Sequence, residues 1–564
     1  MRLFPLVFLW SFLSAGFLFS QDEPDAALDP ASLRLPGVAE LSAPPWYPEL
    51  VSYNPAVTAR SAEVQQHVNH GMALIHGGWD FEAYRHFLAA VEQDPDCLMA
   101  YWGMALSLAN PNTEAKEQRA AALNRLFALI AAGKGTEGER AQGEALLVFF
   151  SDEPQRAPGV FRAVSEDYPN HLQLQLMAAF LQRDGYDELL GPGPGQRAAV
   201  EEIEAILAEQ PDSRMALSFW ANLQIENPAP PAEFAEKLLP RVRTLTDSAP
   251  EFPPYRELLG TFERRAGQLS AAKANFQIAI ELYEKSLAAS GVSIFDCPNL
   301  IRAKLSLAHV LHALGEDAAA KALAQDLAAV DVPYERLYSP GATLLLWEGR
   351  TLGARLALAG GEAADFAKGL ASLPAQAVGQ QLAKETPSVL AWEAWHHALS
   401  CRQAIGEKDW GKAERLLNAL ATSDGLLGEV AGVVATGSSR QSWQRTRRAL
   451  KVEWMLTKGL LATAQAGAGD PAAGDFWFRS AVDELEPPQG LFPPLSQSRP
   501  ALIFARHLAQ RGDEEGANQF FAKARLASPH HVAVLRAQEK WLRASGKTGE
   551  ADRIKALLAT VIGK

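Results

Sequence analysis

The sequence predicts an all-α protein built as a solenoid of stacked helix pairs. From about Ser61 onward, Ala and Leu recur at spacings of three and four over stretches of about 12–16 residues. Short turns that contain Gly, Asp or Pro separate these stretches. No convincing alternation of apolar and polar residues indicates strands. A pattern that returns about every 34 residues indicates that the helices come in similar pairs.

The repeated pattern is clearest between Val64 and Cys97. It combines small residues, one aromatic and a final proline, at Gly71, Ala83, Phe87, Ala90 and Pro95. The small residues let two helices approach, the aromatic fills the gap between them, and the proline ends the second helix. The same series returns twice in phase, as Gly260, Gly267, Ala272, Phe276 and Ala279, and as Gly512, Ala517, Phe521, Ala524 and Pro529.

This series resembles the tetratricopeptide repeat (TPR), a resemblance that implies a right-handed superhelix with a concave binding surface. The first copy also resembles the opening repeat of a family of exported bacterial TPR proteins that has no settled activity. Members of that family carry histidine-rich helices further along, whereas the corresponding stretch here, Tyr255–Phe262, has no histidine. The resemblance therefore implies no metal or catalytic role for that stretch. The residues that carry the family resemblance are Asn69–Gly71, Phe81–Ala83, His86–Phe87 and Asp94–Ala105.

Five parts are expected along the chain. Arg2 followed by the uncharged Leu3–Phe19 is typical of a secretory signal, with an uncleaved anchor as the alternative. We therefore expect an exported protein, periplasmic or secreted, without a membrane span after cleavage. The expected parts are a signal peptide (1–20), a Pro/Ala-rich tether that docks only near its aromatic end (21–60), an N-terminal TPR-like array (61–327), a divergent helical array with irregular segments (328–485), and C-terminal TPR-like pairs with a cap (486–564).

The net charge, the cysteine count and the motifs argue against several classes of function. The chain has 53 Lys plus Arg against 66 Asp plus Glu, a net charge of −13, which makes nucleic acid an unfavourable partner. The odd number of cysteines, Cys97, Cys297 and Cys401, favours buried thiols over a disulfide framework. No hydrolase elbow, zincin helix, phosphate loop or EF-hand loop occurs. We therefore expect no enzyme and no cofactor.

A basic surface is predicted on the concave side of the superhelix. Counting along the first helix of the units that begin near Pro253 and Ile301 places arginines and histidines at positions that face this groove in TPR proteins. Their positive charge suits an acidic peptide or a small acidic ligand. The alternative is a solvated helix face whose arginines pair with nearby glutamates. The predicted ligand-binding residues are Arg264, Arg265, Arg302, His309 and His312.

The sequence thus favours a non-enzymatic scaffold that binds a protein segment or a small acidic ligand in the groove. The alternative function is a metal-binding protein or metal-dependent enzyme centred on the first repeat. There, His67 and His70 lie one helical turn apart, a spacing that metal ligands use. His70 also fits the simpler hypothesis of a histidine buried between two helices. The alternative metal ligands are His67, His70, His76 and Cys97.

Overall fold

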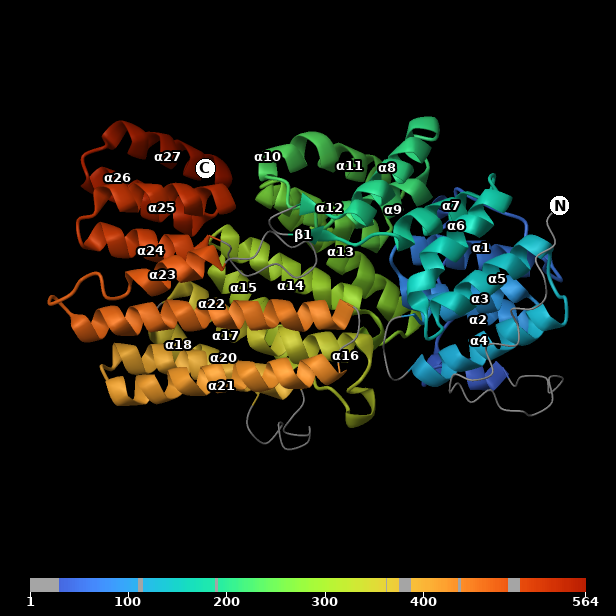
Figure 1. The fold of residues 1–564 in the computed structure, drawn as a ribbon, viewed down its shortest axis with the longest axis horizontal. Helices are drawn as coiled ribbons and strands as arrows, with labels where there is room; N and C mark the ends of the chain where they lie inside the picture. Colours follow the sequence, from blue (N-terminus) through green and yellow to red (C-terminus); the bar gives the residue numbers. More distant parts are fainter. Residues whose placement is uncertain are drawn as a thin grey trace. The chain divides into compact units, whose positions relative to one another are not determined.

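The computed structural model describes residues 30–109, 115–187, 191–361, 363–374, 387–434, 438–484 and 498–563. Its chain divides into two units: unit 1 ends at Trp220 and unit 2 begins at Ala221, except that Gly185–Gly193 belongs to unit 2. The expected signal peptide and the expected boundary at residue 486 lie outside the described residues. Figure 1 shows the helices of both units, coloured from blue to red in the order of the sequence.

Unit 1 consists of helices and short 3₁₀ turns. Its elements are η2 (Pro30–Leu33), η3 (Val38–Glu40), η4 (Pro48–Leu50), α1 (Ala62–His76), α2 (Asp80–Gln93), α3 (Leu98–Ser107), α4 (Lys116–Ala131), α5 (Glu137–Phe149), η6 (Pro154–Arg156), α6 (Ala157–Asp167), α7 (Leu172–Leu181) and α8 (Pro194–Glu209). The boundary between the units falls inside α9 (Arg214–Gln224).

The described residues of unit 2 contain one two-residue β-ladder, in which β1 (Tyr186–Asp187) pairs antiparallel with β2 (Gly191–Pro192), and the remaining elements described there are helices. These are α10 (Pro231–Glu233), η7 (Phe234–Leu238), α11 (Leu239–Asp247), α12 (Pro253–Arg265), α13 (Leu269–Ser290), η8 (Ile294–Asp296), α14 (Pro298–Ala313), α15 (Asp317–Ala329), η9 (Tyr334–Arg336), α16 (Pro340–Leu344), η10 (Leu345–Gly349), α17 (Arg350–Gly360), α18 (Ala363–Ser372), α20 (Pro387–Gly406), α21 (Trp410–Val434), α22 (Ser438–Ala466), α23 (Asp475–Asp483), α24 (Arg499–Gln510), α25 (Glu514–Ala527), α26 (Val532–Ala544) and α27 (Thr548–Val561).

The predicted all-α stack of TPR-like helix pairs is confirmed. Most helices pack against the next one in sequence, as α1 does on α2, α12 on α13, and α24 on α25 (Figure 1). The predicted irregularity of the second half is also present. Helices α20, α21 and α22 are 20, 25 and 29 residues long, whereas α1 and α2 of the first pair have 15 and 14 residues, and α20 packs on both α21 and α22.

In the helix pairs that match the repeat pattern most completely, one aromatic ring packs against a glycine of the neighbouring helix. A Cβ placed on Gly71 of α1 would lie 2.7 Å from the ring of Phe87, and one on Gly103 of α3 would lie 2.2 Å from it. In the later pair, a Cβ on Gly260 would come within 3.1 Å of Phe276. Phe87 and Phe276 are fully buried. The glycines therefore allow the close approach that the sequence pattern predicts.

In several helix pairs, the turn between the two helices contains a residue whose backbone has a positive φ. In the first pair Gly78 has φ 85°, and the Trp79 N–H then donates to the Leu74 carbonyl, which closes the helix end in the way a Schellman turn does. Glycine fits this position because it has no Cβ. Corresponding glycines with positive φ are Gly133, Gly267, Gly315, Gly512 and Gly546. Between α20 and α21, Lys408 takes this place with φ 61°.

Residues 30–60 form an irregular segment, here called the N-terminal segment, that packs on unit 1. It was expected to dock only near its aromatic end, but it is bound along its described length. The Tyr84 hydroxyl donates to the Leu33 carbonyl at 2.9 Å, and Leu33 is fully buried. Further along, the Thr58 N–H donates to Glu139 at 2.6 Å. The segment covers the apolar face that a first repeat leaves open, which is the task of a cap.

The C-terminal helices of unit 2 contact helices from the beginning of the same unit. The side chain of His530 hydrogen-bonds the Gly267 carbonyl at 2.7 Å, across 263 positions of sequence. A Cβ on Gly315 would lie 3.0 Å from Val532, and the rings of His312 and His531 are 5.4 Å apart. The start of α26 thus contacts the turns that follow α12 and α14.

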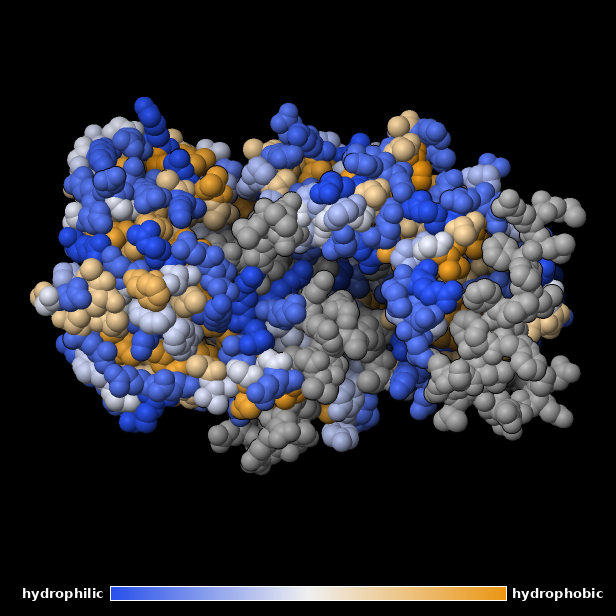
Figure 2. All heavy atoms as spheres, viewed as in Figure 1, coloured by the Kyte–Doolittle hydropathy of each residue, from blue (hydrophilic) through white to orange (hydrophobic). Residues whose placement is uncertain are grey.

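The surface and the cysteines agree with a folded array stabilised by burial. In Figure 2, hydrophilic side chains cover much of the region of α25 to α27. All three cysteines are buried and none forms a disulfide, as predicted. Within the described ranges, every helix is too short or too polar to traverse a lipid bilayer.

Replacing Lys408 by glycine should stabilise the protein. A side chain with a Cβ in the left-handed region costs about 1 kcal/mol, and Lys408 is exposed, so little is lost with its side chain. Thermal unfolding should therefore shift upward in Lys408→Gly. The matched control is Glu407→Gly at the neighbouring exposed position, which lacks the positive φ and should be neutral or destabilising. An equal gain in both variants would contradict the explanation.

Replacing Gly103 by alanine should destabilise unit 1 by about 2 kcal/mol, since the new Cβ would collide with the buried Phe87 ring. Gly425→Ala is the control, because that glycine lies within α21 and nothing stands within 4 Å of its added Cβ. The control should gain about 0.5–1 kcal/mol from helix propensity. Urea unfolding followed by circular dichroism measures both changes.

Candidate functional site

Three histidines meet beneath the aromatic end of the N-terminal segment. His67 and His70 come from α1 and His86 from α2, and Trp46 lies over all three, with ring centroids 4.9, 4.8 and 4.7 Å away. The three histidines are buried, whereas Trp46 remains 46% exposed. The structure therefore builds one aromatic cluster from two helices and the segment.

The hydrogen bonds of this cluster define its tautomers. His86 Nε2 lies 3.0 Å from the Pro45 carbonyl, which only accepts, so this nitrogen carries the proton. His86 Nδ1 is then bare and accepts from His67 Nδ1–H at 3.0 Å. His70 Nε2 accepts from the Tyr47 N–H at 3.1 Å. Because His86 and His70 each accept a hydrogen bond through a ring nitrogen, these two rings must be neutral.

Burial keeps these rings neutral. Desolvation lowers the pKa of His70 to about 4, helped by the charge of His67, and it lowers the pKa of His86 to about 2. The pKa of His67 is also lowered by burial, against the pull of Glu63. Beside them, burial raises the pKa of Glu82 to about 7, although the Arg85 guanidinium 2.6 Å away opposes this change. The cluster thus favours uncharged groups.

The four proposed metal ligands are not brought together. The His76 ring packs against Phe219, 4.9 Å between centroids, and the buried Cys97 precedes α3, where burial raises its pKa to about 12. His67 and His70 meet His86 instead. Among the described residues no group of three or more His, Cys, Asp or Glu side chains could hold a metal ion. The simpler hypothesis for His70, burial between two helices, agrees with this geometry.

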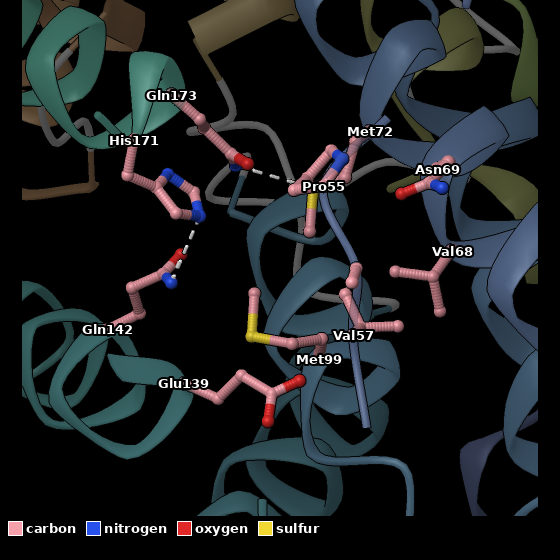
Figure 3. A pocket seen from close by; sticks show the side chains of 11 residues that line it. Pro55, Val57, Val68, Asn69, Met72, Met99, Glu139, Gln142, His171 and Gln173 are labelled. Carbon is pink, nitrogen blue, oxygen red and sulfur yellow. Dashed lines mark hydrogen bonds between the residues drawn. The ribbon is translucent and has the colours of Figure 1, made fainter. Parts of the chain in front are cut away.

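A small pocket lies elsewhere in unit 1, between the N-terminal segment and α1, α3, α5 and α7 (Figure 3). Its volume is about 20 Å³, which accommodates about one water molecule. Three polar atoms around it, Asn69 Oδ1, Gln142 Oε1 and His171 Nδ1, have no hydrogen-bond partner among the described residues. The pocket is too small for an organic ligand.

Two of the predicted ligand residues are engaged inside the fold of unit 2. Arg265 donates to the carbonyl of Ile225 at 3.0 Å and to that of Asn227, and its guanidinium lies 4.2 Å from the Phe234 ring centroid. Arg302 forms an ion pair with Glu257, which also accepts from the Tyr283 hydroxyl at 2.9 Å. Both arginines therefore have structural partners.

The other three predicted residues lie in one neighbourhood. Burial lowers the pKa of His309 well below its usual value, and the nearby charges of Arg264 and His312 lower it further. His312 Nδ1 is 2.7 Å from the Asp317 carboxylate, and its ring meets that of His531. Burial lowers the pKa of Arg264 to about 10.

A fourth group, Arg355 of α17, joins this neighbourhood, and sequence reasoning missed it. Its charge is the strongest one acting on His309, although it comes from the divergent part of the array. Its guanidinium contacts the Glu348 carboxylate and donates to the Glu348 carbonyl at 3.2 Å. The repeat pattern fades before α17, so counting repeat positions could not find it.

Comparisons with known proteins return only distant structural likenesses. No protein-family model and no curated protein matches the chain. Solved structures with similar helices include the P58(IPK) TPR domain (13% identity, 82% of this chain and 98% of that chain, TM-score 0.19), human IFIT1 in a dimer with PPP-AAAA (11%, 92% and 99%, 0.28) and yeast Tom70 (11%, 89% and 99%, 0.22). All TM-scores are below 0.5, so these likenesses lead to no conclusion about partners or activity.

Acid should destabilise unit 1 through its buried histidines. The pKa of His76 falls to about 4 in the folded state because of burial, against 6.5 when unfolded. Between these values the unfolded chain binds more protons, so stability is lost as the pH drops from about 6.5 to 4, by up to about 1.4 kcal/mol per pH unit for each such histidine.

The variant His76→Phe isolates one such contribution, since phenylalanine cannot be protonated and can pack against Phe219. Urea midpoints at pH 7 and pH 5 should differ less in this variant than in the wild type. An unchanged difference between the two midpoints would contradict the assignment.

Proposed function

We propose that this chain is a non-enzymatic scaffold that binds an acidic protein segment or a small acidic ligand on the inner side of unit 2. The observation that carries the proposal is the neighbourhood of Arg264, His309 and Arg355, which gathers cationic and hydrogen-bond-donating groups from α12, α14 and α17. In a protein of net charge −13, such a basic centre favours an acidic partner.

The helix-pair architecture supports this proposal. Stacked pairs bury a continuous core and offer a preformed inner face, so a ligand binds with a small ordering cost. The proposed ligand-contacting set is His309 with the basic groups that act on it, Arg355, Arg264 and His312. Arg355 and His312 also pair with Glu348 and Asp317. Arg265 and Arg302 lie outside this group and are left out of the set.

The proposal includes export of the protein from the cytoplasm. The apolar stretch that follows Arg2 supports a secretory signal, and a periplasmic or extracellular scaffold would meet soluble or envelope proteins there. The net negative charge supports a protein or small-molecule partner over nucleic acid.

The test is binding of a fluorescently labelled octaglutamate peptide, measured by anisotropy at low salt. Arg264→Gln should weaken binding at least about tenfold, because a charge-assisted hydrogen bond contributes about 1.5–3 kcal/mol. The matched control is Arg525→Gln, which removes an exposed arginine from α25 and should leave binding unchanged. Equal binding by wild type and Arg264→Gln, or no binding by the wild type, would contradict the proposal.

A further inference from the structure

Residues 51–60 of the N-terminal segment, here called the strap, have the form of an extended peptide. Every second residue from Val51 to Ala59 is partly buried, and each residue between them is exposed. Such alternation is typical of an extended chain with one face against a surface. From Tyr53 to Arg60 the strap forms no backbone–backbone hydrogen bond among the described residues. Its shape is therefore maintained by the surface of unit 1 on which it lies.

Side chains of two helices bind the backbone of the strap. Gln65 of α1 does so twice, since its Nε2 donates to the Pro55 carbonyl at 2.9 Å and its Oε1 accepts from the Val57 N–H at 2.8 Å. The Glu139 carboxylate of α5 accepts from both the N–H and the hydroxyl of Thr58, each at 2.6 Å. Bonds to the main chain supply affinity but place few demands on the sequence of the bound segment.

Alternate side chains of the strap contact the same surface. The Tyr53 ring packs edge-on against His171, with 5.8 Å between ring centroids. Pro55 and Val57 line the small pocket of unit 1, beside Met72 (Figure 3). Contacts to alternate side chains are what give an extended peptide its specificity. The strap site is defined here as this pocket together with Gln65, Asp94, Glu139, Gln142 and His171.

The strap leaves polar atoms of its site unpartnered. Asn69 and Gln142 line the pocket and are each 3% exposed, and their side-chain oxygens have no hydrogen-bond partner among the described residues. The strap residues that line the same pocket are Pro55, Ala56 and Val57, which have no polar side-chain atom. Unpartnered buried polar atoms are costly. The volume of about 20 Å³ accommodates one hydroxyl-sized group, so a segment that supplied such a group would fit the site better.

The charges of the site favour an uncharged occupant. Glu139 lies against Thr58, and the Asp94 carboxylate accepts from the Arg60 N–H at 2.7 Å. Residues 51–59 include no charged side chain. Glu139 is only 5% exposed, and like charges repel strongly where water is excluded, so an acidic segment is disfavoured here.

We propose that the strap site binds an extended, uncharged segment of a partner protein, and that the strap occupies the site in cis until such a segment displaces it. The partner segment has apolar side chains at alternate positions and a small hydroxyl side chain over the pocket. Covalent attachment gives the strap an effective concentration on the order of 1 mM, so the strap restricts the site to segments that fit better. This inference goes beyond the proposed function, because it concerns unit 1 and a partner without acidic groups.

The experiment measures, by anisotropy, how the full chain binds a fluorescently labelled peptide with the sequence of residues 51–60. The variant Tyr53→Ala/Val57→Ala weakens the strap and leaves the site intact. It should bind the peptide at least about tenfold more tightly than the wild type, because displacement of the strap then costs less. Ser52→Ala, at an exposed strap position, is the matched control and should bind like the wild type.

A double variant that keeps its helical circular dichroism and binds the peptide no better than the wild type would overturn the proposal. Should the double variant not fold, Thr58→Ala is the second variant. It removes only the hydroxyl bond to Glu139 and should tighten peptide binding about threefold.

Two further variants test the place and the chemistry of binding. Gln65→Ala, added to the double variant, should weaken peptide binding at least about tenfold, because both bonds to the bound backbone are lost. A peptide that carries Val57→Glu should bind at least about tenfold more weakly than the original peptide. Unchanged binding in either case would overturn the proposal.

The oligomeric state separates a partner protein from a second copy of this chain. Wild-type dimers that the free peptide dissociates would overturn the proposal, because the strap of the other copy would then be the occupant. Octaglutamate is not expected to bind the strap site. Failure of the peptide experiment therefore leaves the scaffold proposal for unit 2 standing, and failure of octaglutamate binding leaves this one standing.

Discussion

Close contact between a glycine on one helix and an aromatic ring on the next is the interaction on which the array depends. Phe87 fills the space left at both Gly71 and Gly103, so a single ring fixes the spacing of three consecutive helices. Because the interior is close-packed, this spacing sets where the neighbouring side chains of α1 and α2 meet, including the histidines beneath Trp46. The geometry of the cluster thus follows from the packing of the repeat.

The two groups of histidines illustrate different uses of burial. In unit 1, His67, His70 and His86 hydrogen-bond each other or the backbone of the N-terminal segment, and His70 Nδ1 is the one ring nitrogen of the three that is buried without a partner among the described residues. In unit 2, both nitrogens of His309 are without partners in the described chain. The first arrangement stabilises a fold. The second is the kind of local cost that proteins tolerate where a ligand compensates for it.

The sequence predicts the helix pairs well because their causes are local. A glycine, an aromatic and a turn glycine at set spacings are enough to place α12 and α13, and Gly260 meets Phe276 as expected. The docking of the N-terminal segment could not be predicted in full, since contacts such as Leu33 with Tyr84 join residues about fifty positions apart without any periodic signal. The residues proposed to contact a ligand were only partly accessible to sequence reasoning. Repeat counting found Arg264 and His309, but it could not reveal that Glu257 already engages Arg302, nor that Arg355 arrives from a helix with no recognisable repeat.

The contact between His530 and Gly267 changes the mechanical character of unit 2. An open solenoid behaves like a spring, because each repeat touches only its neighbours and small rotations add up along the chain. A bond across 263 positions joins two distant turns of such a spring. Bending at one repeat must then be matched at another, so unit 2 should resist stretching and should lose its last helices together with its first ones, where an open array would fray from one end.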